Sequence, residues 1–259
     1  MQKNNLRFCA NISLLFNELP LRERFAAAKQ AGFNAIEMQF PYETPLQELI
    51  QLQQENQLHI VLINVAAGDL MQGGEGLAAV PHKQAEFDAA LSQCLEYARA
   101  LKVECVNVLP GRCINKNQYD SYLATYKTNL LKAANALQAI NIKCTFEAIN
   151  TSDMPHFLIH NSTQMHSIIA ELKHPNIFMQ YDIYHMTKMG MNIIDDLNNY
   201  AAEIGHVQFA DCPGRAEPGT GNIDFDAIFS ALSATHYSGW VGAEYKPSQT
   251  TLKSLHWYY

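Results

Sequence analysis

The segment Ile177–His185 constrains the fold more than any other part of this sequence. It is an apolar run that ends at the carboxylate of Asp182, and an imidazole, His185, follows three residues later. Pro175 and Asn176 mark a turn immediately before the run. An apolar run of this length predicts a buried strand. The charge at its end must therefore lie at the rim of a core, where it is either paired or used for chemistry.

Strand-like and helix-like segments alternate along the whole chain. The predicted strands cover residues 7–12, 35–40, 59–65, 104–109, 142–147, 177–182, 206–210 and 240–246. The predicted helices cover residues 20–32, 46–52, 82–101, 118–139, 162–172, 193–204 and 225–234. Strict alternation implies parallel strands, and eight such units in 259 residues predict a single (β/α)8 TIM barrel over residues 1–259. A doubly wound open sheet is the alternative, but no GxGxxG motif follows the first strand.

One long connection interrupts this rhythm between residues 66 and 81. It contains Gly68, Gly73, Gly74 and Gly76 and shows no periodicity. No GK[ST] sequence follows these glycines, so they do not form a phosphate-binding loop. Long connections without regular structure are often functional. We therefore consider a lid over an active site and a plain surface excursion as the two alternatives.

Composition excludes several classes of partner. A formal net charge of −7 argues against a nucleic-acid partner, and no apolar run reaches the roughly 18 residues of a membrane span. The six cysteines form no CxxC pair, and Cys9, Cys105 and Cys144 fall inside predicted strands, so we expect buried free thiols. The N-terminal stretch lacks the pattern of a signal peptide. These features predict a cytoplasmic protein.

Polar residues follow the last four predicted strands at the point where each one ends. They are Glu147, Asp182, Gln208 (with His206 two residues before it) and Glu244. The carboxyl ends of the strands carry the active site in TIM barrels, so these side chains are expected to converge. Three converging carboxylates repel one another, and a divalent cation between them would relieve this repulsion. Because the set offers only oxygen ligands, it favours Mg²⁺ or Mn²⁺ over zinc.

Several basic residues accompany this set. Lys246 lies two positions past Glu244 and thus on the same face, and Arg215 follows the seventh predicted strand. A small anionic substrate beside several carboxylates needs such cations. His185 is a candidate donor to a substrate oxygen. The alternatives remain open: Lys188, Arg215 or Lys246 could simply pair with the acids, and His185 could be a satisfied structural group.

Long motifs in this chain resemble the hydroxypyruvate isomerase family. They are Arg7–Ser13, Phe40–Tyr42, Ala67–Asp69, Phe146–Asn150, Gln180–Met186, His206–Asp211, Pro213–Arg215, Glu217–Gly221 and Gly239–Pro247. The resemblance implies a xylose isomerase-like barrel that isomerises a small anionic keto acid, hydroxypyruvate, to tartronate semialdehyde through an enediol. It also implies a divalent metal held by Glu147, Asp182, Gln208 and Glu244, with Glu147 and Glu244 exchanging protons with the substrate. His185, Arg215 and Lys246 are then expected to bind the substrate.

Other functions are possible at the same site. An isomerase of four-carbon 2-oxo acids (2-oxotetronate isomerase) is the nearest alternative, followed by a metal-dependent lyase. An endonuclease of the same superfamily would need a multi-histidine zinc cluster and a basic groove, and neither is visible in the sequence. A non-catalytic binding protein does not explain four polar strand ends. The aromatic C-terminal segment 255–259 is expected to pack either on the barrel or on a partner subunit in a homo-oligomer.

Overall fold

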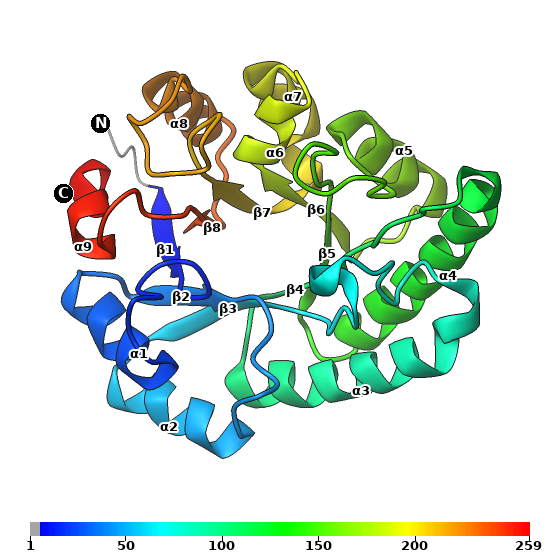
Figure 1. Ribbon diagram of the computed structural model, residues 1–259, viewed down its shortest axis with the longest axis horizontal. Helices are drawn as coiled ribbons and strands as arrows, with labels where there is room; N and C mark the ends of the chain where they lie inside the picture. Colours follow the sequence, from blue (N-terminus) through cyan, green and yellow to red (C-terminus); the bar gives the residue numbers. More distant parts are fainter. Residues whose placement is uncertain (1–5) are drawn as a thin grey trace.

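The structure, a computed structural model, describes residues 6–259 and contains a closed barrel of eight parallel strands (Figure 1). The strands are β1 (Arg7–Asn11), β2 (Ala35–Met38), β3 (His59–Asn64), β4 (Cys105–Asn107), β5 (Lys143–Glu147), β6 (Ile177–Asp182), β7 (Ile204–Phe209) and β8 (Trp240–Ala243). Each strand pairs with its neighbour in the chain, and β8 returns to β1, where Trp240 pairs with Arg7 and Ala243 with Ala10. The predicted TIM barrel is confirmed.

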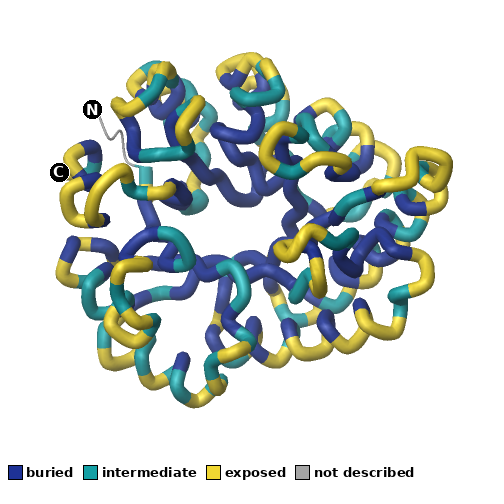
Figure 2. The backbone as a smooth tube through the Cα atoms, in the orientation of Figure 1, coloured by how far each residue is buried: buried dark blue, intermediate teal, exposed yellow. Residues whose placement is uncertain are grey.

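Helices surround the strands, as Figure 1 shows. They are α1 (Leu21–Gln30), α2 (Leu46–Glu55), α3 (Gln84–Leu101), α4 (Tyr119–Gln138), α5 (Ser162–Leu172), α6 (Ile183–Lys188), α7 (Ile193–Tyr200), α8 (Phe225–Ala234) and α9 (Thr251–Ser254), with short 3₁₀ helices η1 (Leu70–Gln72), η2 (Pro81–Lys83), η3 (Lys116–Gln118), η4 (Ala201–Glu203) and η5 (Leu255–Trp257). Figure 2 shows the strands as a buried inner ring within exposed outer turns. Strands covered on both faces are buried almost throughout, which is why they are nearly continuous apolar runs in the sequence.

Several predicted boundaries differ from the observed ones, and two of them involve β7 and β8. The helix expected over residues 193–204 ends at Tyr200, because Ile204 already pairs with Met179 in β6. Gly205 does not end a helix; it lets β7 approach β6, since an added Cβ would lie 2.6 Å from the Cβ of Phe178. The strand expected over residues 240–246 ends at Ala243. Glu244 therefore follows the last strand directly and does not lie within it.

The long connection between β3 and α3 is not a plain surface excursion. Its second half, Leu77–Val80, is buried in the main core. Its first half includes η1, where Leu70 is buried beside Leu109 and Met71 is exposed. The connection is therefore anchored at one end and passes close to the carboxyl ends of the strands.

The aromatic C-terminal segment packs on the barrel. The Trp257 ring lies edge-on to Phe209 with centroids 4.9 Å apart, and Tyr258 stacks on Phe33 with centroids 4.3 Å apart. Trp257 also lies edge-on to Phe8, with centroids 5.4 Å apart, so the segment covers the outside of β1 and β7. None of the helices within residues 6–259 combines the length and the apolar character needed to cross a membrane.

Candidate active site

A cavity of about 520 Å³ opens at the carboxyl ends of the strands. Five of the seven predicted site residues line it, namely Glu147, His185, Arg215, Glu244 and Lys246. The other two, Asp182 and Gln208, are buried and lie outside its lining. Leu70 and Met71 of η1 also line the cavity, so the long connection after β3 forms part of its wall. The cavity volume of about 520 Å³ lies in the range typical of small-molecule binding pockets.

Glu147 ends β5 and is held through one of its two oxygens. Its Oε2 accepts hydrogen bonds from Asn107 Nδ2 and Gln180 Nε2, both at 3.1 Å, while His185 Nε2 lies 3.8 Å from Oε1. Burial raises the pKa of the Glu147 carboxyl well above its usual range, and the charges of Glu244 and Asp182 raise it further. Oε1 therefore remains free to meet a ligand, on a carboxyl group poised to hold a proton.

Glu244 follows β8 and is more heavily engaged. Oε1 accepts hydrogen bonds from Asn11 Nδ2 at 2.9 Å and Gln39 Nε2 at 2.8 Å. Oε2 lies 3.0 Å from Arg215 Nη2. Burial raises the pKa of Glu244 to about 7, although the positive charge of Arg215 opposes this shift. The two glutamates thus differ because only Glu244 is paired with a cation.

Asp182 ends β6 and caps the helix that follows. Its Oδ1 accepts hydrogen bonds from the backbone N–H groups of Tyr184 at 2.7 Å and His185 at 3.2 Å. Its Oδ2 is buried and accepts no hydrogen bond within the described chain. An unpartnered carboxylate oxygen, close to two other buried carboxylates, is the arrangement that a hard divalent cation satisfies. The residues present therefore fit such an ion.

His185 is set as a hydrogen-bond donor by Asn150. The side-chain oxygen of Asn150 accepts bonds from the backbone N–H groups of Ser152 and Asp153, so its Nδ2 faces the His185 ring and lies 2.6 Å from Nδ1. Burial lowers the pKa of His185 to about 4, so the ring is neutral near pH 7. Since Nδ1 accepts a bond, the ring hydrogen must be on Nε2. A protonated Nε2 cannot ligate a metal, although His185 lies within reach of the Glu147 and Asp182 carboxylates.

Gln208 belongs to a chain of side-chain amides. Its Oε1 accepts a hydrogen bond from Gln180 Nε2 at 2.6 Å, and its Nε2 donates to Glu37 Oε1 at 2.6 Å. Gln180 Nε2 also donates to Glu147, so two amides connect Glu37 to Glu147. An amide oxygen has two lone pairs, which leaves Gln208 one for a further partner.

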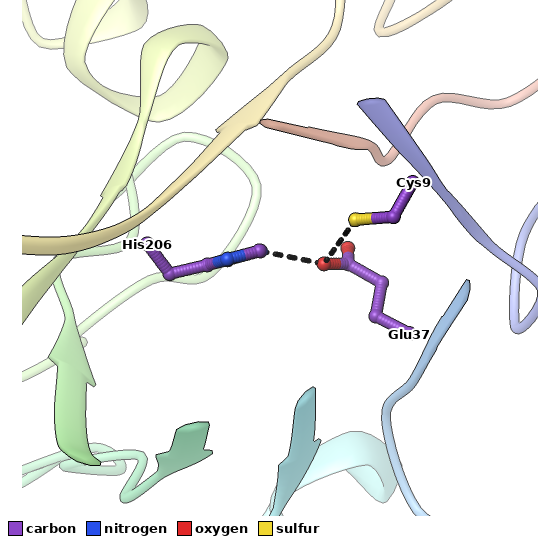
Figure 3. A group of neighbouring side chains, drawn as sticks. All are labelled: Cys9, Glu37 and His206. Atoms are coloured by element: carbon purple, nitrogen blue, oxygen red, sulfur yellow. Dashed lines mark hydrogen bonds and ion pairs between the residues drawn. The ribbon is translucent and has the colours of Figure 1, made fainter. Parts of the chain in front are cut away.

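Glu37, in β2, is the largest omission from the sequence prediction. Figure 3 shows its carboxylate between His206 and Cys9, with His206 Nε2 at 2.6 Å and Cys9 Sγ at 3.8 Å from Oε2. Asn11 Nδ2 donates to Glu37 Oε1 and to Glu244 Oε1, each at 2.9 Å. The carboxylate is buried and accepts from four side chains, so the cluster is explained by hydrogen bonding without an ion. A charge within the predicted strand 35–40 was the signal that could have revealed it.

The basic residues of the cavity occupy different environments. Arg215 lies over the Tyr184 ring, with its guanidinium carbon 5.3 Å from the centroid, and reaches Glu244. Lys188 pairs with Asp153 at 2.8 Å. The Lys246 side chain is exposed, and its backbone N–H donates to the Arg215 carbonyl. Pairing with one of the strand-end acids, the alternative considered for these three cations, therefore holds for Arg215 alone, because the partner of Lys188 is Asp153.

Comparisons with known proteins agree with this geometry. A family profile described as "Xylose isomerase-like TIM barrel" matches residues 25–259. The chain is 39% identical to the hydroxypyruvate isomerase of Escherichia coli K12 over 97% of this chain and 98% of that protein. It is 36% identical to the 2-oxo-tetronate isomerase of Cupriavidus necator over 97% of this chain and 96% of that protein.

Solved structures show the same architecture. A Brucella melitensis protein described as an AP endonuclease of family 2 superposes with a TM-score of 0.94, at 32% identity over 98% of both chains. The 3-keto-D-glucoside 4-epimerase of E. coli superposes with a TM-score of 0.79 over 96% of this chain and 97% of that one. At 19% identity the latter shows the fold alone. Within residues 6–259, neither group of potential metal ligands contains more than one histidine, unlike the zinc cluster expected of an endonuclease.

Proposed function

Because the chain belongs to the xylose isomerase-like TIM barrel family, and within it to the hydroxypyruvate isomerases, we propose that it interconverts hydroxypyruvate and tartronate semialdehyde. The observation that carries the proposal is the placement of Glu147 and Glu244 on the wall of one cavity at the barrel mouth. Both carboxyl groups are buried, and both have raised pKa values because of that burial. Groups that exchange protons near pH 7 need such shifts.

The reaction moves a carbonyl between two neighbouring carbons. One glutamate removes a proton from C3 of hydroxypyruvate, which leaves an enediolate with a C2–C3 double bond and the negative charge on the C2 oxygen. The second glutamate delivers a proton to C2, and the C3 hydroxyl proton passes to the C2 oxygen, so that an aldehyde forms at C3. No atom is gained or lost. This chemistry needs one carboxylate that accepts and one carboxylic acid that donates.

The differing environments of the two glutamates suit these roles. Arg215 stabilises the charged form of Glu244, whereas Glu147 has no cationic partner and is the more strongly shifted towards its protonated form. We therefore assign Glu244 as the group that removes the C3 proton and Glu147 as the group that protonates C2. His185, with its hydrogen on Nε2, donates to a substrate oxygen between them.

The metal is part of the proposal. Glu147, Asp182, Gln208 and Glu244 would hold Mg²⁺ or Mn²⁺, as the unpartnered Oδ2 of Asp182 supports. When bound, the ion supplies stabilisation of the negative charge that develops on the substrate oxygens. We also propose a cytoplasmic location, which is supported by six free cysteines, five of them buried.

Two substitutions test the catalytic pair. Glu147→Gln and Glu244→Gln each remove a proton-transfer group while keeping its shape, so each is expected to lower kcat by about 10²- to 10⁴-fold. The assay follows hydroxypyruvate turnover by coupling tartronate semialdehyde to its reductase. Glu86→Gln, on the exposed face of α3, is the matched control and should retain full activity. Near-wild-type turnover in either catalytic variant would overturn its role.

The same assay tests the metal and the substrate. Activity should fall after chelation and return when Mg²⁺ or Mn²⁺ is added. Activity unaffected by chelation would contradict the metal proposal but leave the reaction in place. A four-carbon 2-oxo acid is the second candidate substrate, favoured by the 36% identity to a 2-oxo-tetronate isomerase. Turnover of that acid alone would transfer the same proton chemistry to a longer substrate.

A further inference from the structure

Two cations in the cavity wall form no ion pair among residues 6–259. Four basic residues line the cavity, namely Arg112, Lys188, Arg215 and Lys246. Lys188 and Arg215 form ion pairs with Asp153 and Glu244. Neither Arg112 nor Lys246 has an acidic group within ion-pairing distance among residues 6–259. The cavity thus offers two cations that are not neutralised by the protein.

Arg112 is the less solvated of these two. Lys246 is exposed, so water satisfies its ammonium group. Arg112 is half-buried, and its Nε is buried without a hydrogen-bond partner in the described chain. An unsatisfied buried donor on a charged group is costly unless a ligand completes it. A planar guanidinium with free donors facing a cavity matches the two oxygens of a carboxylate.

Hydrogen bonds on both sides anchor the backbone around Arg112. The Arg112 N–H donates to the carbonyl of Glu75 at 2.9 Å, and the Leu158 N–H donates to the carbonyl of Gly111 at 2.9 Å. The guanidinium lies against Gly73, where an added Cβ would be 3.7 Å from Arg112 Nη1. Arg112 is therefore fixed between the connection after β3 and the loop after β5. Such pre-organisation lowers the entropic cost of binding a ligand.

Charge also favours an anion at this position. The catalytic glutamates and Asp182 make the floor of the site acidic, and Arg215 already compensates Glu244. The carboxylate of a keto acid is repelled from this floor, while its reacting carbons must approach it. A cation in the wall that is not committed to any glutamate resolves this conflict, because it can hold the charged end of the substrate away from the acids.

We propose that Arg112 binds the carboxylate of the substrate through paired N–H···O contacts and thereby selects acids over neutral molecules of similar size. This assignment rests on the proposed function, because it takes the substrate to be an acid. It gives Arg112 a role that was predicted from the sequence for Arg215 and Lys246. Arg215 forms an ion pair with Glu244, and Lys246 is an exposed cation at the edge of the cavity.

Steady-state kinetics with hydroxypyruvate provide the first test. Arg112→Gln should raise KM by about tenfold to a hundredfold, as expected for the loss of a charge-assisted pair, with kcat changed only a few-fold. Arg112→Lys keeps the charge but loses the paired N–H donors, so its KM should lie between those of wild type and Arg112→Gln. Lys116→Gln is the control, because Lys116 is an exposed cation in the same β4–α4 connection as Arg112 but does not line the cavity. Its kinetic constants should equal those of wild type. An unchanged KM in Arg112→Gln would overturn the inference.

Calorimetric binding of glycerate, which carries the carboxylate but cannot isomerise, separates this inference from the proposed function. Wild-type protein should bind glycerate but not glycerol, and Arg112→Gln should weaken glycerate binding by about tenfold to a hundredfold. If glycerate binding depends on Arg112 in this way but the wild-type protein does not turn over hydroxypyruvate, the proposed reaction is rejected and the Arg112 carboxylate site is retained. Two outcomes would overturn the site: no glycerate binding by wild type, or binding lost in Lys246→Gln and retained in Arg112→Gln.

Discussion

Glu37→Gln is the substitution that most directly tests the polar network beneath the active site. The Glu37 carboxylate accepts hydrogen bonds from His206, Gln208 and Asn11 at 2.6 to 2.9 Å, and it is buried. A glutamine keeps the shape but replaces one accepting oxygen with an NH₂ donor. Either a buried donor must then face another donor, or the hydrogen of His206 must move to Nδ1, which is buried and has no partner in the described chain. The network cannot relax into water, because no member of it is exposed.

The expected cost is that of leaving buried donors without an acceptor, about 3 kcal/mol. For a chain of this size, 1 kcal/mol corresponds to about 2 to 4 °C in Tm, so Tm should fall by about 6 to 12 °C. Activity should also fall in the folded protein. If Gln208 turns its amide to suit the new amide at position 37, then Gln180 must turn as well, and its oxygen would face Glu147.

Thermal and denaturant unfolding measure the effect. Asp196→Asn is the matched control. Asp196 is also a buried acid, and it accepts a hydrogen bond of 2.8 Å from the Tyr181 hydroxyl. The amide oxygen of an asparagine can accept the same bond. The substitution should cost only about 1 kcal/mol. Adding His206→Gln to Glu37→Gln should recover part of the loss, since two amides can pair. Stability of Glu37→Gln within about 1 kcal/mol of wild type would show that the network does not depend on the charge.

Two further predictions concern stability alone. Gly242→Ala should lower the free energy of unfolding by about 1 to 3 kcal/mol in denaturant, because the new Cβ would lie 2.4 Å from Glu37 Oε2. Gly214→Ala is the control and should cost less, because no atom lies within 4 Å of the new Cβ. Equal effects of the two substitutions would contradict the packing argument. The hydrogen bond from His59 lowers the pKa of Glu104 to about 2 from a usual 4.5, so its carboxylate stabilises the fold above pH 4.5 and this contribution is lost as the pH falls towards 2. Between about pH 5 and about pH 3, Tm should therefore fall further in wild type than in Glu104→Gln, and parallel curves would refute this.

Local sequence patterns were sufficient to predict the barrel and the positions of most catalytic candidates. Hydrophobic periodicity and turn residues are local signals, and each strand of a parallel barrel carries them independently. Helix α5 and strand β6 begin and end at the predicted residues. Since the carboxyl ends of parallel strands meet at one mouth, Glu147 and His185 could be placed there from the chain alone.

The pairing of polar groups, in contrast, depends on the closed barrel. Glu37 meets His206 and Gln208 across 169 and 171 residues of sequence, and these contacts exist only because the barrel closes with one particular register. Nothing in the sequence indicated the free donors of Arg112 either, because whether a cation is paired depends on which side chains pack around it. Periodicity states which side of a strand a residue faces. It does not state which residue lies opposite, and hydrogen bonding depends on that.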